Sequence, residues 1–544
     1  MNIRNIIYDI IIFIVIIIFV YLNKNKLLKY KKLPNNLGVS MPGCAFGSLI
    51  VFNGYFRAFF DENNYFTYNE FTNPKNTIFT VCSGGNFMWP VFNGKQPSEE
   101  LFGKYIESET LPSDLNKLKS DQNLGILLSK YNIFDSIFKD FDIQKILEDI
   151  KEDKKEAWDA TVKEWYKNIN QMTQKNDDAP KANFMSMVCG VKPTLLDKTW
   201  IEYKYLLFNN LNNISDVSSS DLIVQNLKKG KRVYKPYLIS NKQKIDTSYW
   251  ASSAMGIFSA TYITSKCKKY DDLSDCFAKY SSCNECDTKE IEEKKKIVLE
   301  KVAINVANWK ILKDRILESA NLKGRLKLLE EKLYFTDGGV IDVNAIILNL
   351  INQSKNLIVF NINQCGGLKS YFKIKGDDSF CFLIQPVFAE GEWDRMVEEA
   401  KKNFRETGVE YAVLDNVKVM KNKRFGIKEY TIEKMFVMNL IPTLTQENSL
   451  EKKDTSKLFF ESQWYNNLNV KIKDYIKKEA ETMGDKGIQK GFFLQKGCHS
   501  KTIDKYIPKK LDAFLVSNYC TWQMKIVLQR KEVVDFFRKS LANN

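Results

Sequence analysis

The chain has 544 residues, of which 44% are hydrophobic and 27% charged, with only 12 Pro and 25 Gly. This composition excludes a disordered, collagen-like or low-complexity protein and is sufficient for a large core. The single histidine, His499, excludes metal sites with several histidine ligands, and its polar surroundings favour a surface residue over a member of a Ser-His-Asp triad. Lys and Arg exceed Asp and Glu by 81 to 66, a net charge of +15, which favours an anionic partner, either nucleic acid or an acidic lipid surface.

The amino terminus predicts a membrane anchor. Residues 6–22 are apolar or aromatic except Asp9, and a helix of that length spans about 25 Å, enough to cross a locally thinned bilayer. The segment is apolar on all faces and has no small-residue cleavage site, which indicates an uncleaved single anchor at residues 1–22. Five lysines follow in a basic stalk, residues 23–37, against Arg4 alone before the anchor. The positive-inside rule therefore places the rest of the chain in the cytoplasm. The anionic membrane surface becomes the expected partner, and no nucleic-acid-binding motif is present.

The cysteines leave the redox state open. Eleven is an odd number, so at least one thiol of a monomer is free, and a cytoplasmic domain is expected to keep all eleven reduced. Four lie within twenty residues, at Cys267, Cys276, Cys283 and Cys286, and only the last two have the spacing that zinc prefers. A zinc knuckle, two disulfides and an accident of codon usage all remain possible. Disulfides would reverse the predicted orientation.

Two consecutive strand-loop-helix units follow the stalk. The first consists of an apolar strand, a turn-prone run of small residues and an apolar helix, at residues 37–41, 42–48 and 49–60. The second consists of a β-branched strand, a sharp turn and the start of another apolar stretch, at residues 77–81, 82–85 and 86–92. Such repetition predicts an α/β fold with a central, mostly parallel sheet surrounded by helices.

The rest of the chain predicts helical insertions around that sheet. Charged stretches of helical character lie at about residues 100–175 and 267–331. Their helices are expected at Leu101–Glu107, Ile143–Lys151, Lys154–Asn168 and within Thr288–Glu331. A further strand is expected at residues 356–362, and no internal repeat is visible. We therefore expect one catalytic domain over residues 38–544.

Ser83 is the first candidate for chemistry. A serine in a tight turn between a β-branched strand and an apolar segment has the pattern of a nucleophile elbow, in which the turn exposes the hydroxyl group. Gly84 and Gly85 would give the chain room to fold back, although Val81 stands where Gly-x-Ser-x-Gly has its first glycine. A plain Ser-Gly-Gly turn is the structural alternative. Moving the frame by one residue makes Cys82 an alternative nucleophile, activated by a helix amino terminus.

A second motif lies far along the chain. Asp337, Gly338 and Gly339 follow a short strand-like run and precede Asn344 and the strand at residues 356–362. This segment resembles the catalytic-aspartate region of the phospholipase B (lysophospholipase) and cytosolic phospholipase A family, which is related to patatin. The same family has Gly-x-Ser-Gly-Gly at its nucleophile and Ser-Gly-Gly-Gly-x-Arg-Ala ahead of it, which residues 81–85 and 42–48 resemble in the same order. The chain is thus identified as a divergent member.

The resemblance implies a mechanism that needs neither histidine, metal nor cofactor. Asp337 would accept the proton of Ser83 as the hydroxyl attacks an ester carbonyl, and water would later hydrolyse the acyl-enzyme. Backbone N–H groups of Gly43 and Cys44 would form the oxyanion hole, and Gly84, Gly85, Gly338, Gly339 and Asn344 would shape the two loops. The expected substrate is a phospholipid or lysophospholipid.

Departures from the family pattern support a different function. Gly47 stands where the family has an arginine that holds the lipid phosphate, and Arg57 lies too far along the expected helix to be assumed a replacement. The alternative is a catalytically inactive, membrane-tethered scaffold of the same fold that binds lipid or protein. The retained Asp337 favours an enzyme, because no structural reason requires an aspartate there. Head group, acyl position and oligomeric state are not predicted.

Overall fold

The computed structural model describes residues 35–60, 66–88, 99–129, 183–191, 203–209, 221–225, 236–240, 334–337, 342–362, 368–372, 386–422, 425, 427–446, 455–481, 494 and 509–542. The expected anchor at residues 1–22, most of the stalk and the four clustered cysteines lie outside these residues. So do the helices expected at Ile143–Lys151, Lys154–Asn168 and within Thr288–Glu331. Among the helices that are described, none is both long enough and apolar enough to cross a membrane.

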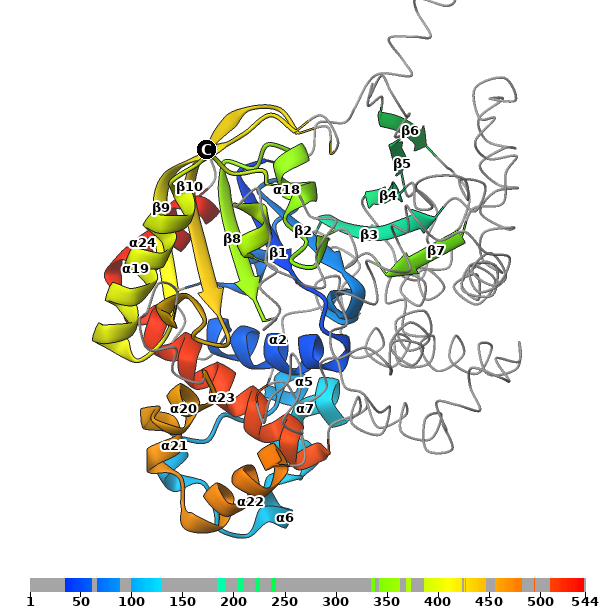
Figure 1. Cartoon of the computed structure of the whole chain (residues 1–544). Helices are drawn as coiled ribbons and strands as arrows, with labels where there is room; N and C mark the ends of the chain where they lie inside the picture. Colours follow the sequence, from blue (N-terminus) through cyan, green and yellow to red (C-terminus); the bar gives the residue numbers. More distant parts are fainter. Residues whose placement is uncertain are drawn as a thin grey trace, which may run out of the picture.

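A ten-stranded mixed sheet forms the centre of the molecule (Figure 1). Its strands are β1 (Leu37–Met41), β2 (Thr77–Cys82), β3 (Asn183–Val191), β4 (Tyr203–Asn209), β5 (Asp221–Gln225), β6 (Pro236–Ser240), β7 (Tyr334–Asp337), β8 (Asn356–Asn361), β9 (Tyr411–Val419) and β10 (Tyr430–Asn439). The order is β6-β5-β4-β3-β2-β1-β8-β10-β9, and β7 pairs with β3. The run β3-β2-β1-β8-β10 is parallel, and every other pair is antiparallel.

The predicted α/β class is confirmed, and the parallel part of the sheet is limited to its five central strands, which antiparallel strands extend on both sides. Strands β1, β2 and β8 are buried at every residue, as expected for parallel strands covered on both faces. Their sequences are correspondingly apolar almost throughout. The strands expected at residues 37–41, 77–81 and 356–362 match the observed bounds to within one residue.

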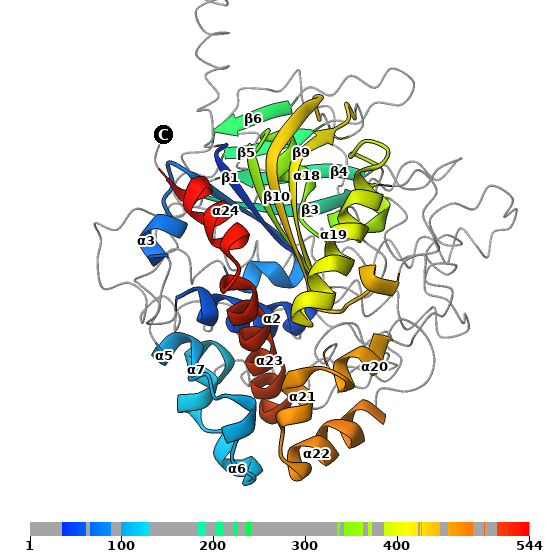
Figure 2. The same cartoon turned by 90° about the vertical axis from the view of Figure 1, so that its left-hand side faces the viewer.

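Helices cover both faces of the sheet and form a group beyond its end (Figure 2). The α-helices are α2 (Ala45–Phe59), α3 (Tyr68–Phe71), α5 (Glu99–Phe102), α6 (Leu115–Leu118), α7 (Asp121–Ser129), α18 (Ile347–Ile351), α19 (Glu392–Thr407), α20 (Thr455–Phe460), α21 (Gln463–Asn467), α22 (Val470–Glu481), α23 (Lys510–Leu528) and α24 (Lys531–Leu541). The 3-10 helices are η1 (Ser83–Met88), η2 (Ser108–Thr110), η6 (Lys369–Tyr371) and η7 (Leu444–Gln446). In Figure 2, α23 lies between the α5–α7 group and the α20–α22 group.

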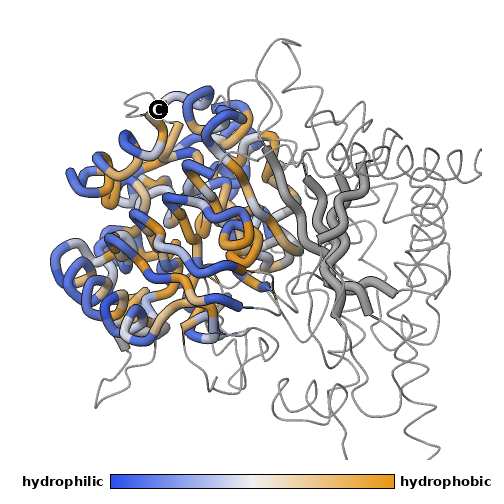
Figure 3. Tube along the Cα trace, turned by 90° about the horizontal axis from the view of Figure 1, so that it is seen from above, coloured by the Kyte–Doolittle hydropathy of each residue, from blue (hydrophilic) through white to orange (hydrophobic). Residues whose placement is uncertain are grey.

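The hydrophobic core is divided by the sheet into two clusters. Helices α2, α23 and α24 pack on one face, and α18 and α19 pack on the other. Hydrophobic segments lie inside these layers, while hydrophilic turns of the helices lie at the periphery (Figure 3). Helix α2 is largely apolar and is buried along most of its length, because it is enclosed between the sheet and α23.

The contact between α2 and α23 is unusually close. A Cβ atom at Gly54 would lie 2.3 Å from the backbone oxygen of Ser517, so only glycine fits. Arg57, one turn further along α2, is buried and donates to Ser517 Oγ at 2.6 Å, Thr521 Oγ1 at 2.9 Å and the Lys104 carbonyl at 3.0 Å. Arg57 therefore holds α23 against α2.

Three expected helix bounds differ from the structure. The helix expected at Leu101–Glu107 ends at Phe102, because Gly103 adopts φ +76° and its backbone packs against residue 123, where a Cβ would be only 2.1 Å from an oxygen. Helix α2 begins at Ala45, four residues before the expected start. After β2, the chain enters the 3-10 helix directly at Ser83.

Candidate active site

The site lies at the carboxyl ends of the parallel strands. Strand β1 pairs with β2 on one side and with β8 on the other, and the connections that follow β1 and β8 cover opposite faces of the sheet through α2 and α19. This is a topological switch point, where the connections after two neighbouring strands leave for opposite faces of the sheet. Open α/β sheets bind their ligands at such points. The segments that start there are Pro42–Cys44 after β1, Ser83 after β2 and Ile362 after β8.

Ser83 opens η1 immediately beyond the end of β2. The short helix passes very close to the end of β1, since a Cβ atom at Gly85 would lie 2.5 Å from the Met41 carbonyl oxygen. Glycine is required at position 85 for this approach, and Gly84 is buried beside it. The turn therefore has the compact backbone that the sequence pattern suggested for residues 83–85.

Asp337 ends β7, and the register of β3 places its backbone beside the end of β2. Cys82 is paired with Met187, and Asp337 is paired with the next residue, Val188. Strand β2 is parallel to β3 and β7 is antiparallel, so the two strands run toward each other along one edge of β3 and their carboxyl ends meet. Consecutive residues of a strand are about 3.3 Å apart. Two segments separated by some 250 residues of sequence thus bring Ser83 and Asp337 together at one point of the sheet.

Cys82 links three loops of the site. Its buried Sγ accepts a hydrogen bond from the Gly43 N–H at 3.2 Å and donates to the Val343 carbonyl at 3.2 Å. The Gly43 N–H also approaches the Val343 carbonyl at 3.2 Å. The thiol therefore connects the loops after β1, β2 and β7. The N–H group expected in the oxyanion hole at Gly43 is bonded within the protein in this arrangement, and its catalytic role stays a prediction.

Cys44 differs from the expectation for the thiols. It forms a disulfide bond, whereas Cys82 and Cys520 form none. The expectation that all eleven cysteines are reduced is therefore wrong at Cys44. The cytoplasmic location of the domain stays a prediction.

Asp342 and Tyr371 organise the loop that follows β7, and the sequence analysis assigned neither a role. The Asp342 carboxylate accepts from the Ile346 N–H at 2.9 Å, from the Ile347 N–H at 2.7 Å and from the Tyr371 hydroxyl. Tyr371 in turn accepts from the Asn344 N–H at 3.2 Å. Complete burial raises the pKa of Asp342 to about 6, against the opposing effect of these three donors. An Asp five residues before a short, mainly apolar helix was the available signal.

Asn349 on α18 fastens this loop to the sheet. Its Nδ2 donates to Ser40 Oγ on β1 at 2.9 Å and to Thr80 Oγ1 on β2 at 2.7 Å, and Thr80 donates to the Ala345 carbonyl at 2.5 Å. A Cβ at Gly38 would lie 2.5 Å from Asn349 Oδ1, so the glycine makes room for the contact. Ser40 of β1 and Thr80 of β2 therefore help to position the loop after Asp337.

The remaining predicted residues are placed only in part. Asn344 is buried, and neither amide atom has a hydrogen-bond partner. Gly338 and Gly339 lie outside the described residues. Within the described ranges, no three side chains of His, Cys, Asp or Glu gather as a metal site.

Comparison with known proteins finds only a distant likeness. No protein family matches the chain, and no curated protein matches it in sequence. Among solved structures it is similar to human GIVD cytosolic phospholipase A2, with a TM-score of 0.37 and 8% identity. The match covers 94% of this chain and 63% of that one, so this chain spans less than two thirds of that protein's length. A likeness of this extent assigns no function.

Proposed function

We propose that the protein is an acyl-ester hydrolase of the phospholipase or lysophospholipase type, with Ser83 as nucleophile and Asp337 as general base. The observation that carries this proposal is the meeting of β2 and β7 at Met187 and Val188 of β3. It brings a serine after a tight turn next to an aspartate at a strand end, at the edge of the sheet where α/β enzymes bind ligands. Hydroxyl and carboxylate are the two groups that a histidine-free dyad requires.

The proposed reaction proceeds through an acyl-enzyme. Asp337 takes the Ser83 proton while the oxygen attacks the ester carbonyl, and the proton passes to the departing alcohol. Water then attacks the acyl-serine with Asp337 again acting as base, which releases the fatty acid. Stabilisation of the oxyanion by Gly43 requires its N–H to exchange the Val343 carbonyl and Cys82 Sγ for the substrate oxygen.

We further propose that residues 1–22 hold this domain at a bilayer and that the basic stalk contacts anionic lipid. The net charge of +15 and the five stalk lysines support a membrane surface as the partner. Residues 35 and 36, the first that the structure describes, already contact the sheet through bonds from the backbone N–H groups of Lys355 and Asn356. We expect a chain that starts near Asn35 to fold without the anchor.

An inactive scaffold is the second candidate, and one specific observation favours it. The Gly43 N–H is bonded to the Val343 carbonyl and Cys82 Sγ, which leaves this donor unavailable unless the loop moves. Gly47, in place of the family's phosphate-binding arginine, points the same way.

Acyl release from a panel of phospholipids and lysophospholipids, measured with the full chain in detergent, separates the two candidates. We expect Ser83→Ala to lower the rate by a factor on the order of 10³ or more and Asp337→Asn by about 10²–10⁴, with the double variant little worse because the pair acts as a unit. Cys82→Ser keeps a donor and an acceptor, so it is the matched control and should be nearly as active as the wild type.

Labelling with a serine-directed fluorophosphonate gives an independent readout, and chelators should leave the reaction of a soluble ester unchanged. If Cys82→Ser is inactive while Ser83→Ala is normal, the nucleophile is the thiol. If the wild type releases no fatty acid and takes up no label, the protein is the inactive scaffold.

A further inference from the structure

Two asparagines end neighbouring parallel strands at the candidate site. Asn361 is the last residue of β8 and Asn439 the last of β10, and they are paired in register. Side chains alternate along a strand, and Val359 and Val437, two residues earlier, belong to the apolar cluster beneath α19. Both asparagines therefore face the α19 side of the sheet, at its carboxyl edge.

Each of these side chains carries an oxygen without a partner. Asn361 and Asn439 are 6% and 1% exposed, and neither Oδ1 accepts a hydrogen bond. An unsatisfied buried acceptor costs about 1–3 kcal/mol, which is why native proteins keep few of them. Two such oxygens on adjacent strands, at the edge where α/β folds bind ligands, indicate that a ligand supplies the missing donors.

Glu410, just before β9, fixes the orientation of the Asn439 amide and therefore of its unpartnered Oδ1. Asn439 Nδ2 donates to Glu410 Oε1 at 2.5 Å, so Oδ1 of the same amide must face away from the carboxylate. The carboxylate is itself held by the N–H groups of Leu444 at 3.0 Å and Thr445 at 2.7 Å. The amide of Asn439 thus cannot rotate to offer a donor without breaking this arrangement, and it presents an acceptor only.

The location suits the polar part of an ester substrate. Neighbouring strands are about 4.8 Å apart, so Asn361 lies roughly 10 Å from Cys82, two strands away across β1. We infer that Asn361 and Asn439 form a subsite that accepts hydrogen bonds from hydroxyl groups of the substrate's head group, an inference that rests on the proposed esterase function. Neutral amide oxygens match hydroxyl donors, whereas a quaternary ammonium group has no donor to offer.

The test compares two lipids of equal charge and equal chains. Dihexanoylphosphatidylglycerol carries two head-group hydroxyls and dihexanoylphosphatidylmethanol carries none. Calorimetric titration of the full-length Ser83→Ala protein in detergent measures binding without turnover. We expect the glycerol lipid to bind about 5-fold or more tightly, since each neutral hydrogen bond contributes about 2- to 12-fold. Equal affinities for the two lipids would overturn the inference.

Variants of Asn361 then test whether this residue causes the preference for the glycerol lipid. Asn361→Leu removes an unsatisfied acceptor, so it should abolish the preference and raise the melting temperature, whereas a purely structural asparagine would lower it on replacement. Asn361→Ser keeps one oxygen acceptor and should retain part of the preference, and it decides the matter if the leucine variant does not fold. Asn116→Leu, at an exposed asparagine of α6, is the matched control. A full preference in both Asn361→Leu and Asn361→Ser would refute the assignment.

One further measurement distinguishes a lipid head group from a free polyol as the ligand, and another tests the subsite separately from the proposed hydrolysis. Free glycerol that competes with the lipid at equal affinity would identify a free polyol, not a lipid head group, as the ligand. If the wild type releases no fatty acid yet keeps the head-group preference, the proposed hydrolysis fails and the subsite stands. If the wild type hydrolyses both lipids but binds them with equal affinity, the proposed hydrolysis stands and the subsite is refuted.

Discussion

The two faces of the sheet use their polar residues in different ways. On the α2 face, rings from the helix and the strands pack together, for example Phe52 and Tyr55 against Phe360, and the buried cation Arg57 has three acceptors. On the α19 face, two buried carboxyl groups lie near the strand ends, as do Asn361 and Asn439, each with an amide oxygen that has no partner. Buried polar atoms without a partner occur on both faces, as at Asn53 Oδ1 on α2. Those of Asn361 and Asn439 differ in lying together at the carboxyl edge of the sheet, which packing alone does not explain.

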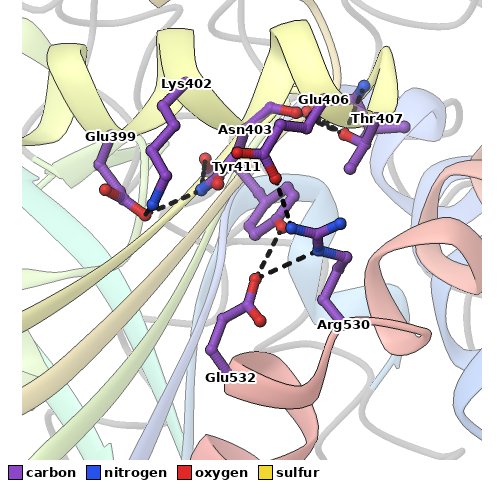
Figure 4. A network of polar contacts seen from close by, with 9 residues as sticks. Glu399, Lys402, Asn403, Glu406, Thr407, Tyr411, Arg530 and Glu532 are labelled. Atoms are coloured by element: carbon purple, nitrogen blue, oxygen red, sulfur yellow. Dashed lines mark hydrogen bonds and ion pairs between the residues drawn. The ribbon is translucent and has the colours of Figure 1, made fainter.

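A surface network joins the two faces around the edge of β9 (Figure 4). Arg530, at the start of α24, pairs with Glu406 on α19 and with Glu532 at 3.4 Å, and the Tyr411 hydroxyl donates to Glu532 at 3.2 Å. Arg530, Glu406 and Glu532 are all at least one-third exposed. Exposed pairs contribute little, so the faces are joined mainly through the sheet itself.

The largest expected effect is on the packing face, at Gly54→Ala. The new Cβ would lie 2.3 Å from the Ser517 carbonyl and 2.6 Å from Cys520 Cβ, so α2 and α23 must separate, at a cost of about 3 kcal/mol in the free energy of unfolding. Urea unfolding followed by tryptophan fluorescence measures it. Gly408→Ala is the matched control, because its Cβ meets nothing within 4 Å and only the φ of +73° costs about 1 kcal/mol. Equal losses in the two variants would show that the helix contact is not tight.

Arg57→Met should cause the second-largest loss in the free energy of unfolding. It removes three hydrogen bonds between α2 and its neighbours, and we expect a loss of about 2 kcal/mol with the Michaelis constant of any esterase activity unchanged. Chemical denaturation and steady-state kinetics on the same preparation check both parts. A raised Michaelis constant at normal stability would instead mean that Arg57 binds the lipid phosphate.

The α19 face should dominate the pH dependence of stability. Burial raises the pKa of Glu410 from 4.5 to about 7, so between these pH values the folded protein keeps a proton that the unfolded chain has lost. Stability then falls as the pH rises through this window, by up to about 1.4 kcal/mol per pH unit. Glu410→Gln should flatten the slope measured by thermal unfolding from pH 4.5 to 7. An unchanged slope, or a flattening equal to that in the exposed control Glu398→Gln, would contradict the prediction.

The smallest effect is expected at the network between the faces. Arg530→Gln removes exposed ion pairs with Glu406 and Glu532 and should cost less than about 1 kcal/mol, and less still at 1 M salt. Denaturation at two salt concentrations is sufficient. A loss that approaches that of Gly54→Ala would mean that the two faces depend on this network.

Local patterns in the sequence determined the buried strands and the position of each candidate catalytic residue at a strand end. Largely apolar, β-branched runs bounded by turn residues predicted β1, β2 and β8 almost to the residue, because strands buried on both faces need such runs. The same reasoning found Ser83 after one strand and Asp337 at the end of another. It misplaced the end of α5, because Gly103 turns the chain there to meet a distant backbone.

Only the tertiary structure decided which distant groups meet. The approach of Asp337 to Ser83 depends on β3, whose register no local pattern encodes. Two of the side chains that Arg57 contacts, Ser517 and Thr521, lie more than 450 residues away on α23. Cys82 as a link between loops, Asp342 with Tyr371, and the unpartnered oxygens of Asn361 and Asn439 are likewise results of packing. Periodicity tells which face of an element is buried, whereas hydrogen-bond satisfaction depends on what the rest of the chain brings to that face.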